Sequence, residues 1–323
     1  MNRIKSILIY TVCAFVSLEA NAQIRIAKYY DNKQAALSFT FDDGLREQYT
    51  ILFPKMKQLG IKGTFCLIGA WMNNPPKNPN KQPFTWEQAK EMALDGQEIT
   101  SHGYSHKNVT KLTPDELRYE VQHNDTLIYR HTGVFPRTYF YPGNRKSDEA
   151  VAYCSQNRVG TSTFQVSLGS KRTQEWFEQY LTDIIQKGDW AVTMTHGLRI
   201  GYDCFGDETR LWRMFDYALS QQDRLWIATF HDVAAYQQER DNTTLRIKEK
   251  KGRITIEPKR AKETRTEPKI KLDKEIFNHP LTIVLDFKPR SASQAGKPLD
   301  VRAKEGKHLL DFSPTNGKIV IEK

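Results

Sequence analysis

Acidic and imidazole side chains occur in three short clusters, and each cluster directly follows an apolar segment of the chain. The clusters are Asp42-Asp43-Gly44, the pair His102 and His106, and His196-Gly197. Imidazoles and carboxylates bind divalent metals and transfer protons near neutral pH. Two adjacent carboxylates at a strand end repel each other unless a cation neutralises one of them. The clusters therefore indicate a metal site with proton-transferring groups beside it.

Asp43, His102 and His106 are the expected metal ligands. Histidines four residues apart turn their rings to one side if the backbone is helical there, and a carboxylate from another strand completes a facial site. Such a site binds a divalent metal and leaves positions open for water and substrate. The histidine spacing alone is a weak signal, and Asp-Asp-Gly is also common in turns. Their coincidence at two strand ends favours the metal.

The elements that must position these residues form a repeating pattern between residues 35 and 236. Short apolar runs alternate there with helical patterns, which predicts β/α units and a largely parallel sheet. The predicted strands cover residues 35–41, 62–67, 97–101, 138–141, 159–163, 190–195 and 225–229. Seven strands with helices outside indicate an α/β barrel. Barrel chemistry gathers at the carboxyl ends of the strands, where all three clusters fall.

Two of the intervening helices have clear start signals. Thr85 with Gln88 forms one capping box, and Thr113 with Glu116 forms another, with Pro114 at the first helical position. These signals fix where two helices begin.

The pattern changes after Tyr236. Polar and apolar residues alternate in five runs, which cover residues 245–249, 253–257, 281–287, 308–312 and 318–321. The first two runs flank Lys251-Gly252, as the strands of a hairpin would. We therefore expect a signal peptide at residues 1–22, a barrel domain at 23–240, and a basic, β-rich accessory domain at 241–323. This last domain is predicted to be a small all-β sandwich.

Charge and cysteine content exclude some other classes of protein. The 323 residues have a formal net charge of +10, but much of the excess lies in residues 248–271, outside any nucleic-acid recognition motif. This distribution predicts a solvated basic surface and no nucleic-acid partner. Beyond the signal the cysteines are Cys66, Cys154 and Cys204, which predict neither a disulfide framework nor a cysteine zinc site.

The first residues predict export. Arg3 and Lys5 form a basic start, residues 7–16 are mostly apolar, and Ala20-Asn21-Ala22 offers a cleavage site. The apolar run falls short of the roughly 20 residues that span a bilayer, so no membrane span is expected. We expect a secreted or periplasmic protein that is cleaved after Ala22.

These motifs resemble those of polysaccharide deacetylases with NodB homology, also called carbohydrate esterase family 4. Thr40-Phe41-Asp42-Asp43-Gly44 is similar to the first motif of that family. His102-Gly103-Tyr104-Ser105-His106 is similar to the second, H-[ST]-x-x-H, with Gly103 replacing the hydroxyl residue. Met194-Thr195-His196 resembles the late L-x-H motif, and Lys62-Gly63-Thr64-Phe65 resembles the second-strand signature. The likeness covers residues 33–236 in the same order.

The resemblance implies a distorted (β/α)7 barrel that hydrolyses N-acetyl or O-acetyl groups on a polysaccharide or oligosaccharide. It also implies that the metal is Zn²⁺ or a similar ion bound by Asp43, His102 and His106. Asp42 would then act as general base and His196 as general acid. The motifs specify neither the glycan nor an oligomeric state.

Further residues are candidates for substrate binding. Backbone N–H groups near Tyr141 would hold the oxyanion, as the resemblance implies. Tyr104, Phe140 and Tyr141 are candidates for a platform on which sugar rings stack, although core packing is the commoner role of an aromatic residue. The loop of residues 197–207 is a candidate substrate lid.

The sequence departs from the family at two motifs. Phe140 stands in place of the arginine that braces the base, and Arg137, three residues away on a strand, faces the opposite side. The fourth-motif acid has no counterpart, because Asp189 precedes His196 by a whole strand. Two alternatives to a glycan N-deacetylase therefore stay open. One is an O-acetyl-xylan type of esterase, and the other is a degenerate, non-catalytic glycan-binding module.

Overall fold

The computed structural model describes residues 24–162 and 164–323, so the expected signal peptide lies outside the described residues. Contacts divide the chain into two compact units. The larger comprises residues 28–242 and 261–279, and the smaller comprises residues 24–27, 243–260 and 280–323. No helix of the described chain is long and apolar enough to cross a membrane.

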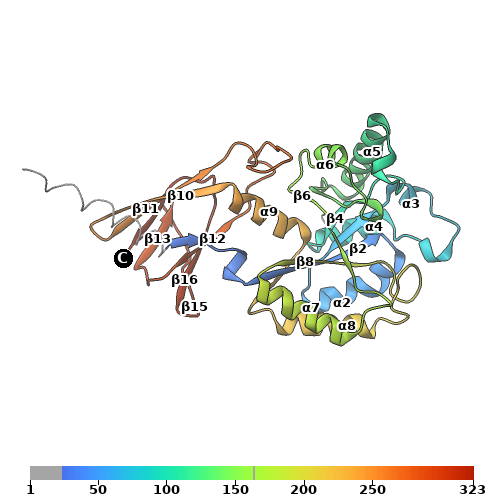
Figure 1. The fold of residues 1–323 in the computed structure, drawn as a ribbon, viewed down its shortest axis with the longest axis horizontal. Coiled ribbons are helices and arrows are strands. Elements are labelled where there is room, and N and C mark those ends of the chain that lie inside the picture. Colours follow the sequence, from blue (N-terminus) through green and yellow to red (C-terminus); the bar gives the residue numbers. More distant parts are fainter. Residues whose placement is uncertain (1–23, 163) are drawn as a thin grey trace, which may run out of the picture. The chain divides into compact units, whose positions relative to one another are not determined.

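The larger unit is built on a curled sheet of parallel strands (Figure 1). Its strands are β2 (Ala35–Asp43), β3 (Thr64–Leu67), β4 (Glu98–Ser101), β5 (Thr138–Tyr139), β6 (Gly160–Thr161), β7 (Val166–Ser167), β8 (Trp190–Thr195) and β9 (Leu225–Ile227). Their order is β6-β5-β4-β3-β2-β8-β7, with β9 paired to the first half of β2. Among the described residues no pairing joins β6 to β7, so the barrel is open on one side. The predicted α/β class and distorted barrel are confirmed.

Helices follow most strands and cover the sheet. They are α2 (Phe53–Leu59), α3 (Gly69–Asn73), α4 (Trp86–Leu94), α5 (Pro114–Thr132), α6 (Asp148–Cys154), α7 (Gln174–Lys187), α8 (Thr209–Ser220) and α9 (Phe230–Asp241). Figure 1 shows α2, α7 and α8 gathered along one side of the sheet. The predicted capping boxes at Thr85 and Thr113 are both formed. Satisfying the free N–H groups of the first turn fixes where α4 and α5 begin.

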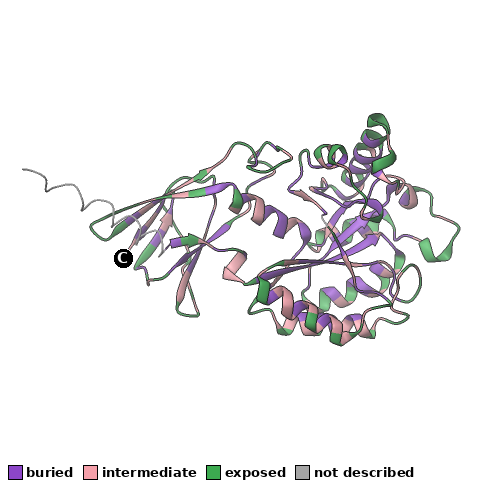
Figure 2. Ribbon diagram, viewed as in Figure 1, coloured by how far each residue is buried: buried purple, intermediate pink, exposed green. Residues whose placement is uncertain are grey.

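Strand β2 shows how the sequence places a polar group inside the barrel. Side chains alternate between the two faces of a strand, and Leu37, Phe39 and Phe41 pack in the core beneath the helices. The Phe39 ring meets the Phe215 ring of α8 edge to face at 4.7 Å. Thr40 and Asp42 occupy the opposite face and are also buried. Figure 2 draws the strands of this sheet largely in the purple of buried residues. The pattern therefore delivers Asp42 to the inner face at the carboxyl end of β2.

A second core lies on the inner face of the sheet. Phe140, Val192 and Phe230 are buried there together with Ile270 and Phe277. The two last residues come from the segment 261–279, which a cut of the chain at residue 240 would assign to the accessory domain. Burial of these apolar side chains holds the segment in the larger unit. The structure differs here from a single cut at residue 240, because the chain leaves the barrel for the hairpin of residues 243–260 and then returns to it.

The smaller unit is an antiparallel β structure of two sheets. One contains β1 (Ile24–Ile26), β12 (Leu281–Leu285), β16 (Lys307–Phe312) and β15 (Arg302–Lys304), and the other β10 (Thr243–Lys250), β11 (Arg253–Arg260), β17 (Ile319–Glu322), β13 (Ser291–Gln294) and β14 (Lys297–Pro298). The expected hairpin turn at Lys251-Gly252 is present, with φ angles of 51° and 78°. Strand β1 precedes the barrel in sequence yet pairs with β12.

The cysteines form no disulfide in the described part of the chain. Cys66 and Cys154 are buried thiols and Cys204 is partly exposed. Burial raises the pKa of the Cys154 thiol to about 12, which keeps the side chain protonated and unreactive. Cys154 is therefore a packing residue.

Candidate metal centre and active site

Asp43, His102 and His106 converge at the carboxyl ends of the strands. One ligand atom from each lies within 4.8 Å of the other two. The Oδ1 atom of Asp43 is 3.7 Å from Nε2 of His102 and 3.6 Å from Nε2 of His106. Two ligands bound at about 2.1 Å to one tetrahedral ion would lie about 3.4 Å apart. The spacing therefore fits three ligands of a single divalent metal.

A local turn brings Asp43 to the same side as Asp42. Regular alternation would send these adjacent side chains to opposite faces. Asp43 instead has a φ of 74°, and Gly44 follows with a φ of 70°. Aspartate tolerates the left-handed region better than most residues because its short polar side chain can bond locally. This turn directs the Asp43 carboxylate towards the two histidines.

The tautomer of His102 suits a metal ligand. Its ring is buried, and Nδ1 lies 3.0 Å from the backbone carbonyl oxygen of Phe140. Because a carbonyl oxygen only accepts, Nδ1 must carry the proton and donate it. The lone pair on Nε2 then points towards Asp43, as in histidines whose other nitrogen is held by a backbone carbonyl.

The two histidines meet through a loop rather than along a helix, which corrects the helical geometry expected from their spacing. Gly103 and His106 both have left-handed backbone conformations, with φ angles of 77° and 59°. A Cβ atom on Gly103 would lie 3.3 Å from the Tyr139 hydroxyl. The positive φ and this close approach explain why glycine replaces a hydroxyl residue there.

Glu120 of helix α5 bonds to the loop that joins His102 to His106. This buried carboxylate accepts a hydrogen bond of 2.8 Å from the backbone N–H of Ser105 and another from the Ser105 hydroxyl. The backbone N–H of Tyr104 donates to the Glu120 carbonyl oxygen at 2.9 Å. These bonds fix the loop between His102 and His106, so Glu120 supports the candidate ligands without belonging to them.

The lack of a hydrogen bond to one Asp43 oxygen also fits a bound cation. Its Oδ1 atom is buried and has no hydrogen-bond partner among the described residues. A buried carboxylate oxygen without a partner is costly, and a bound cation removes that cost. Burial lowers the pKa of His106, and the neighbouring His102 lowers it further. Both effects favour the neutral imidazole that binds a metal.

Asp42 stands beside this cluster and has different contacts. Its Oδ1 atom accepts a hydrogen bond of 3.0 Å from Nε2 of Gln165. Its Oδ2 atom is 3.9 Å from Nε2 of His102. Gln48 ties Asp42 to the third cluster, because its Nε2 donates to the carbonyl oxygens of Asp42 at 2.6 Å and of His196 at 3.1 Å. Neither glutamine belongs to a sequence motif, so sequence reasoning missed both.

His196 follows β8 and opens the loop of residues 197–207. Its Nδ1 is buried with no hydrogen-bond partner in the described residues, which leaves the nitrogen available to exchange a proton. The Tyr202 ring meets the His196 ring edge to face at 5.1 Å and is 74% exposed. The Glu47 carboxylate anchors the start of the loop, since it accepts the backbone N–H of Leu198 at 2.8 Å. Tyr202 was not singled out from the sequence.

The candidate platform residues differ in their exposure. Phe140 is fully buried, with its ring 4.9 Å from that of Phe230, so the expectation that it stacks on sugar is wrong. The Tyr141 ring is buried as well, which leaves only its backbone N–H for substrate. That N–H already donates a hydrogen bond of 3.3 Å to the Ser162 hydroxyl. Tyr104 is partly exposed and packs edge to face on His123 at 4.5 Å.

The two departures from the expected motifs have structural counterparts. The Arg137 guanidinium donates to the carbonyl oxygen of Asn157 at 3.1 Å, and no lysine or arginine among the described residues forms an ion pair with Asp42. Asp189 directly precedes β8, whereas His196 directly follows it. The two residues therefore lie at opposite ends of the strand.

An open parallel barrel with an Asp-His-His cluster at the carboxyl ends of its strands defines an α/β protein with a candidate metal-dependent hydrolase centre. Residues 29–160 match a family described as polysaccharide deacetylase. This match covers 132 of the 323 residues and includes the first two motifs.

Two known proteins are similar in sequence to parts of this chain of different length. A gellan lyase of a Bacillus species is 24% identical over 94% of this chain, which spans 13% of that protein. A peptidoglycan-N-acetylglucosamine deacetylase of Bacillus cereus is 33% identical over 32% of this chain and 34% of its own length. The chain thus spans much less than two thirds of either relative.

One solved structure supports the fold. It comes from Mycobacterium smegmatis and is named provisionally as a polysaccharide deacetylase. The TM-score is 0.50 at 16% identity, over 65% of this chain and 92% of the other. The covered share corresponds in size to the barrel unit.

Proposed function

We propose that this protein is a metal-dependent deacetylase that hydrolyses acetyl groups on a glycan, with N-acetyl groups as the first candidate. The observation that supports this most is the buried, unpartnered Oδ1 of Asp43 facing the Nε2 atoms of His102 and His106. The family that residues 29–160 match points to the same chemistry.

The residues around the cluster suit each step of acetyl hydrolysis. When bound, a divalent metal such as Zn²⁺ lowers the pKa of a water molecule and polarises a carbonyl group. The Asp42 carboxylate takes the proton that the water loses, and its Oδ2 is the oxygen without a contact to Gln165. His196 protonates the leaving nitrogen or oxygen.

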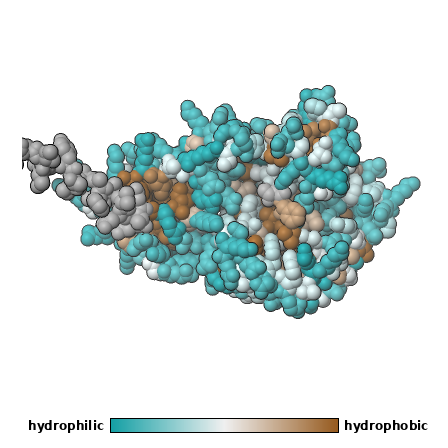
Figure 3. All heavy atoms as spheres, in the orientation of Figure 1, coloured by the Kyte–Doolittle hydropathy of each residue, from teal (hydrophilic) through white to brown (hydrophobic). Residues whose placement is uncertain are grey.

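Exposed apolar side chains near His196 offer a surface for sugar rings. Tyr202, whose ring packs edge to face on His196 at 5.1 Å, is 74% exposed, and Ile200 of the same loop is 46% exposed. Figure 3 shows brown and tan atoms in the middle of this unit's visible face, surrounded by hydrophilic residues. Flat rings stack on the apolar faces of sugars, so we assign the glycan to this surface.

The test is acetate release from acetylated chito-oligosaccharides and from acetyl-xylan, with added zinc and after chelation. We expect zinc-dependent release that is lost in Asp43→Asn, and the better substrate separates amide from ester cleavage. Glycan binding without release from either substrate would instead favour a non-catalytic module. Such a module would need neither Asp42 nor His196.

We also propose that the protein is exported and cleaved after Ala22. That cleavage leaves a single residue before β1, which begins at Ile24. Sequencing the amino terminus of the processed protein tests this, with Gln23 expected first. An intact Met1 on the protein from its native cell would contradict export by this route.

A further inference from the structure

The Gln165 side chain is buried next to the candidate base. Only 3% of its surface is exposed, and it lies immediately before β7. Its Nε2 atom is 3.0 Å from Oδ1 of Asp42 and 2.8 Å from the hydroxyl oxygen of Thr40. One amide nitrogen therefore connects the β7 side of the sheet to two inward-facing residues of β2.

The chemistry of the neighbours determines how this amide is oriented. The Asp42 carboxylate, when ionised, only accepts hydrogen bonds, so it must face the NH₂ group of Gln165. The Thr40 hydroxyl donates its proton to the carbonyl oxygen of Thr193 at 2.6 Å. The Thr40 oxygen is then free to accept the second proton of the same NH₂ group. Both donors of Gln165 are used, and each has an acceptor in place.

This chain of bonds restrains Asp42 in one orientation. Thr40 is anchored to the β8 backbone, Gln165 is anchored to Thr40, and the Oδ1 atom of Asp42 is anchored to Gln165. The other carboxylate oxygen, Oδ2, lies on the side of His102 at 3.9 Å from its Nε2 atom. The bonds therefore present Oδ2, rather than Oδ1, to the candidate metal centre.

The restraint comes from a neutral group. No lysine or arginine of the described residues forms an ion pair with Asp42, and its only ion-pair contact is with His102. An amide donor orients a carboxylate but adds no positive charge next to it.

We infer that Gln165 is a positioning residue that orients Asp42 as the base, with Thr40 holding Gln165 in turn. The inference rests on the proposed deacetylase function and names the residue that takes the place of a cationic brace. In the reaction a proton leaves water and joins Oδ2 of Asp42, while Gln165 keeps both of its protons. Gln165 thus acts only through Asp42.

The test compares two variants of similar shape at this position in the full chain. Gln165→Glu replaces the donor by a carboxylate that repels Asp42, and Gln165→Met removes the donor without a charge. We expect kcat for acetate release to fall about 10- to 100-fold, as for other groups that orient reactive side chains. KM and zinc affinity, measured by competition with a chelator, should stay within about twofold because Gln165 contacts neither zinc ligand nor substrate.

Gln97→Met is the matched control. Gln97 is equally buried, at 3% exposure, and its amide bonds to the backbone of Ile61 and Gly63 and to Asp95. It should lower the melting temperature and leave kcat unchanged. Thr40→Val provides a second route, since it removes the anchor of Gln165 and should lower kcat in the same direction by a smaller factor. Thr40→Val tests the inference if the Gln165 variants fail to fold.

Several outcomes would overturn the inference. An unchanged kcat in both Gln165 variants, or in a folded Thr40→Val if they do not fold, would show that Asp42 needs no such restraint. Loss of zinc binding would show that Gln165 merely maintains the fold of the site. If the zinc-loaded wild-type chain releases no acetate, the proposed function itself fails and this role fails with it. If the wild type and the Gln165 variants are equally active, the role of Gln165 is wrong but the proposed function stands.

Discussion

At the scale of single residues, the candidate site depends on backbone conformations that regular structure does not supply. Asp43 and His106 both have a positive φ, as does Gly103 between the histidines. Non-glycine residues in this region are uncommon, and they cluster where function requires an unusual side-chain direction. Residue types and order predicted from the sequence the three candidate ligands that the structure brings together. The turns that aim them, and the Gln165 contact, follow no motif and could not be predicted.

Removing the carboxylate ligand should remove the metal. In Asp43→Asn the charge that faces two imidazoles is lost, so we expect zinc affinity to fall by about 100-fold or more, beyond the effect of losing an outer-shell contact. Competition with a fluorescent chelator measures this without any substrate. Asp115→Asn, whose side chain is 84% exposed on α5, is the control and should bind zinc as the wild type does. Equal affinity in both variants would exclude Asp43 as a ligand.

Tyr202 should contribute to glycan binding. Its exposed ring beside His196 provides a flat apolar face, and such stacking contributes about 0.5–1.5 kcal/mol. We expect Tyr202→Ala to raise KM for acetylated oligosaccharides about two- to twelvefold at nearly constant kcat. Tyr129→Ala, 54% exposed on the last turns of α5, should change neither constant. A fall in kcat alone would place Tyr202 with the reacting groups instead.

At the scale of elements, helix α5 supports both the site and the sheet. Glu120 holds the histidine loop, and Asn124 donates to the Leu67 carbonyl oxygen at the end of β3. Hydrophobic periodicity and capping boxes predicted the long elements well because each signal spans many residues. The two-residue strand β7 and the three-residue strand β1 were missed, because so few residues show no period. Their places depend on pairing with distant strands.

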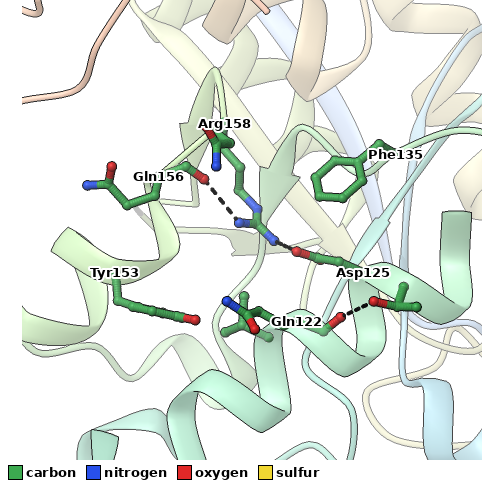
Figure 4. A pocket seen from close by; sticks show the side chains of 9 residues that line it. Gln122, Asp125, Phe135, Tyr153, Gln156 and Arg158 are labelled. Carbon is green, nitrogen blue, oxygen red and sulfur yellow. Dashed lines mark hydrogen bonds and ion pairs between the residues drawn. The ribbon is translucent and has the colours of Figure 1, made fainter. Parts of the chain in front are cut away.

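A buried ion pair links α5 to the chain that enters β6. Arg158 donates to Asp125 and to the carbonyl oxygen of Thr138 at 3.1 Å, beside a pocket of about 340 Å³ (Figure 4). Burial raises the pKa of the Asp125 carboxyl, and the attraction of Arg158 offsets this only in part. The pair is therefore costly to break and contributes little as a pair.

Replacing one partner should cost more than replacing both. We expect Arg158→Met to lower the free energy of unfolding by about 3–5 kcal/mol, because Asp125 stays buried without its partner. The double variant Asp125→Leu with Arg158→Met should recover part of that loss. Urea unfolding of both single variants, the double variant and the wild type gives the coupling. Additive losses would show that the two side chains act independently.

The same pair predicts a pH dependence. A carboxyl group whose pKa is raised in the folded state makes that state bind more protons, so its contribution to stability falls as pH rises through the raised pKa. Without Arg158 the pKa of Asp125 rises further, so the fall in stability continues to a higher pH, towards neutrality. Arg158→Met should therefore be closer to the wild type in stability at pH 5 than at pH 7.5. A gap that is the same at both values would contradict this account.

At the scale of the whole molecule, the two units are not consecutive stretches of sequence. The barrel unit regains residues 261–279, and the sandwich unit begins with residues 24–27. Composition and alternation located both domains, yet they indicated a single cut near residue 240. Neither signal reports which strand pairs with which across more than 250 residues. The register of β1 with β12, in which Ile24 faces Leu285, shows that β1 is part of the sandwich.

Strand β1 should therefore stabilise the smaller unit and not the metal centre. Ile24 is 4% exposed, and Ala27 is buried with Val284 and Leu309. A chain that begins at Lys28 loses this burial, about 1.5–3 kcal/mol for the isoleucine alone, and exposes the edge of β12 to aggregation. Calorimetry should show a lower melting temperature for the sandwich, while zinc affinity matches that of a control chain beginning at Gln23. Loss of zinc binding on this truncation would mean that the sandwich is needed to maintain the barrel, and an unchanged melting profile would mean that β1 contributes nothing to it.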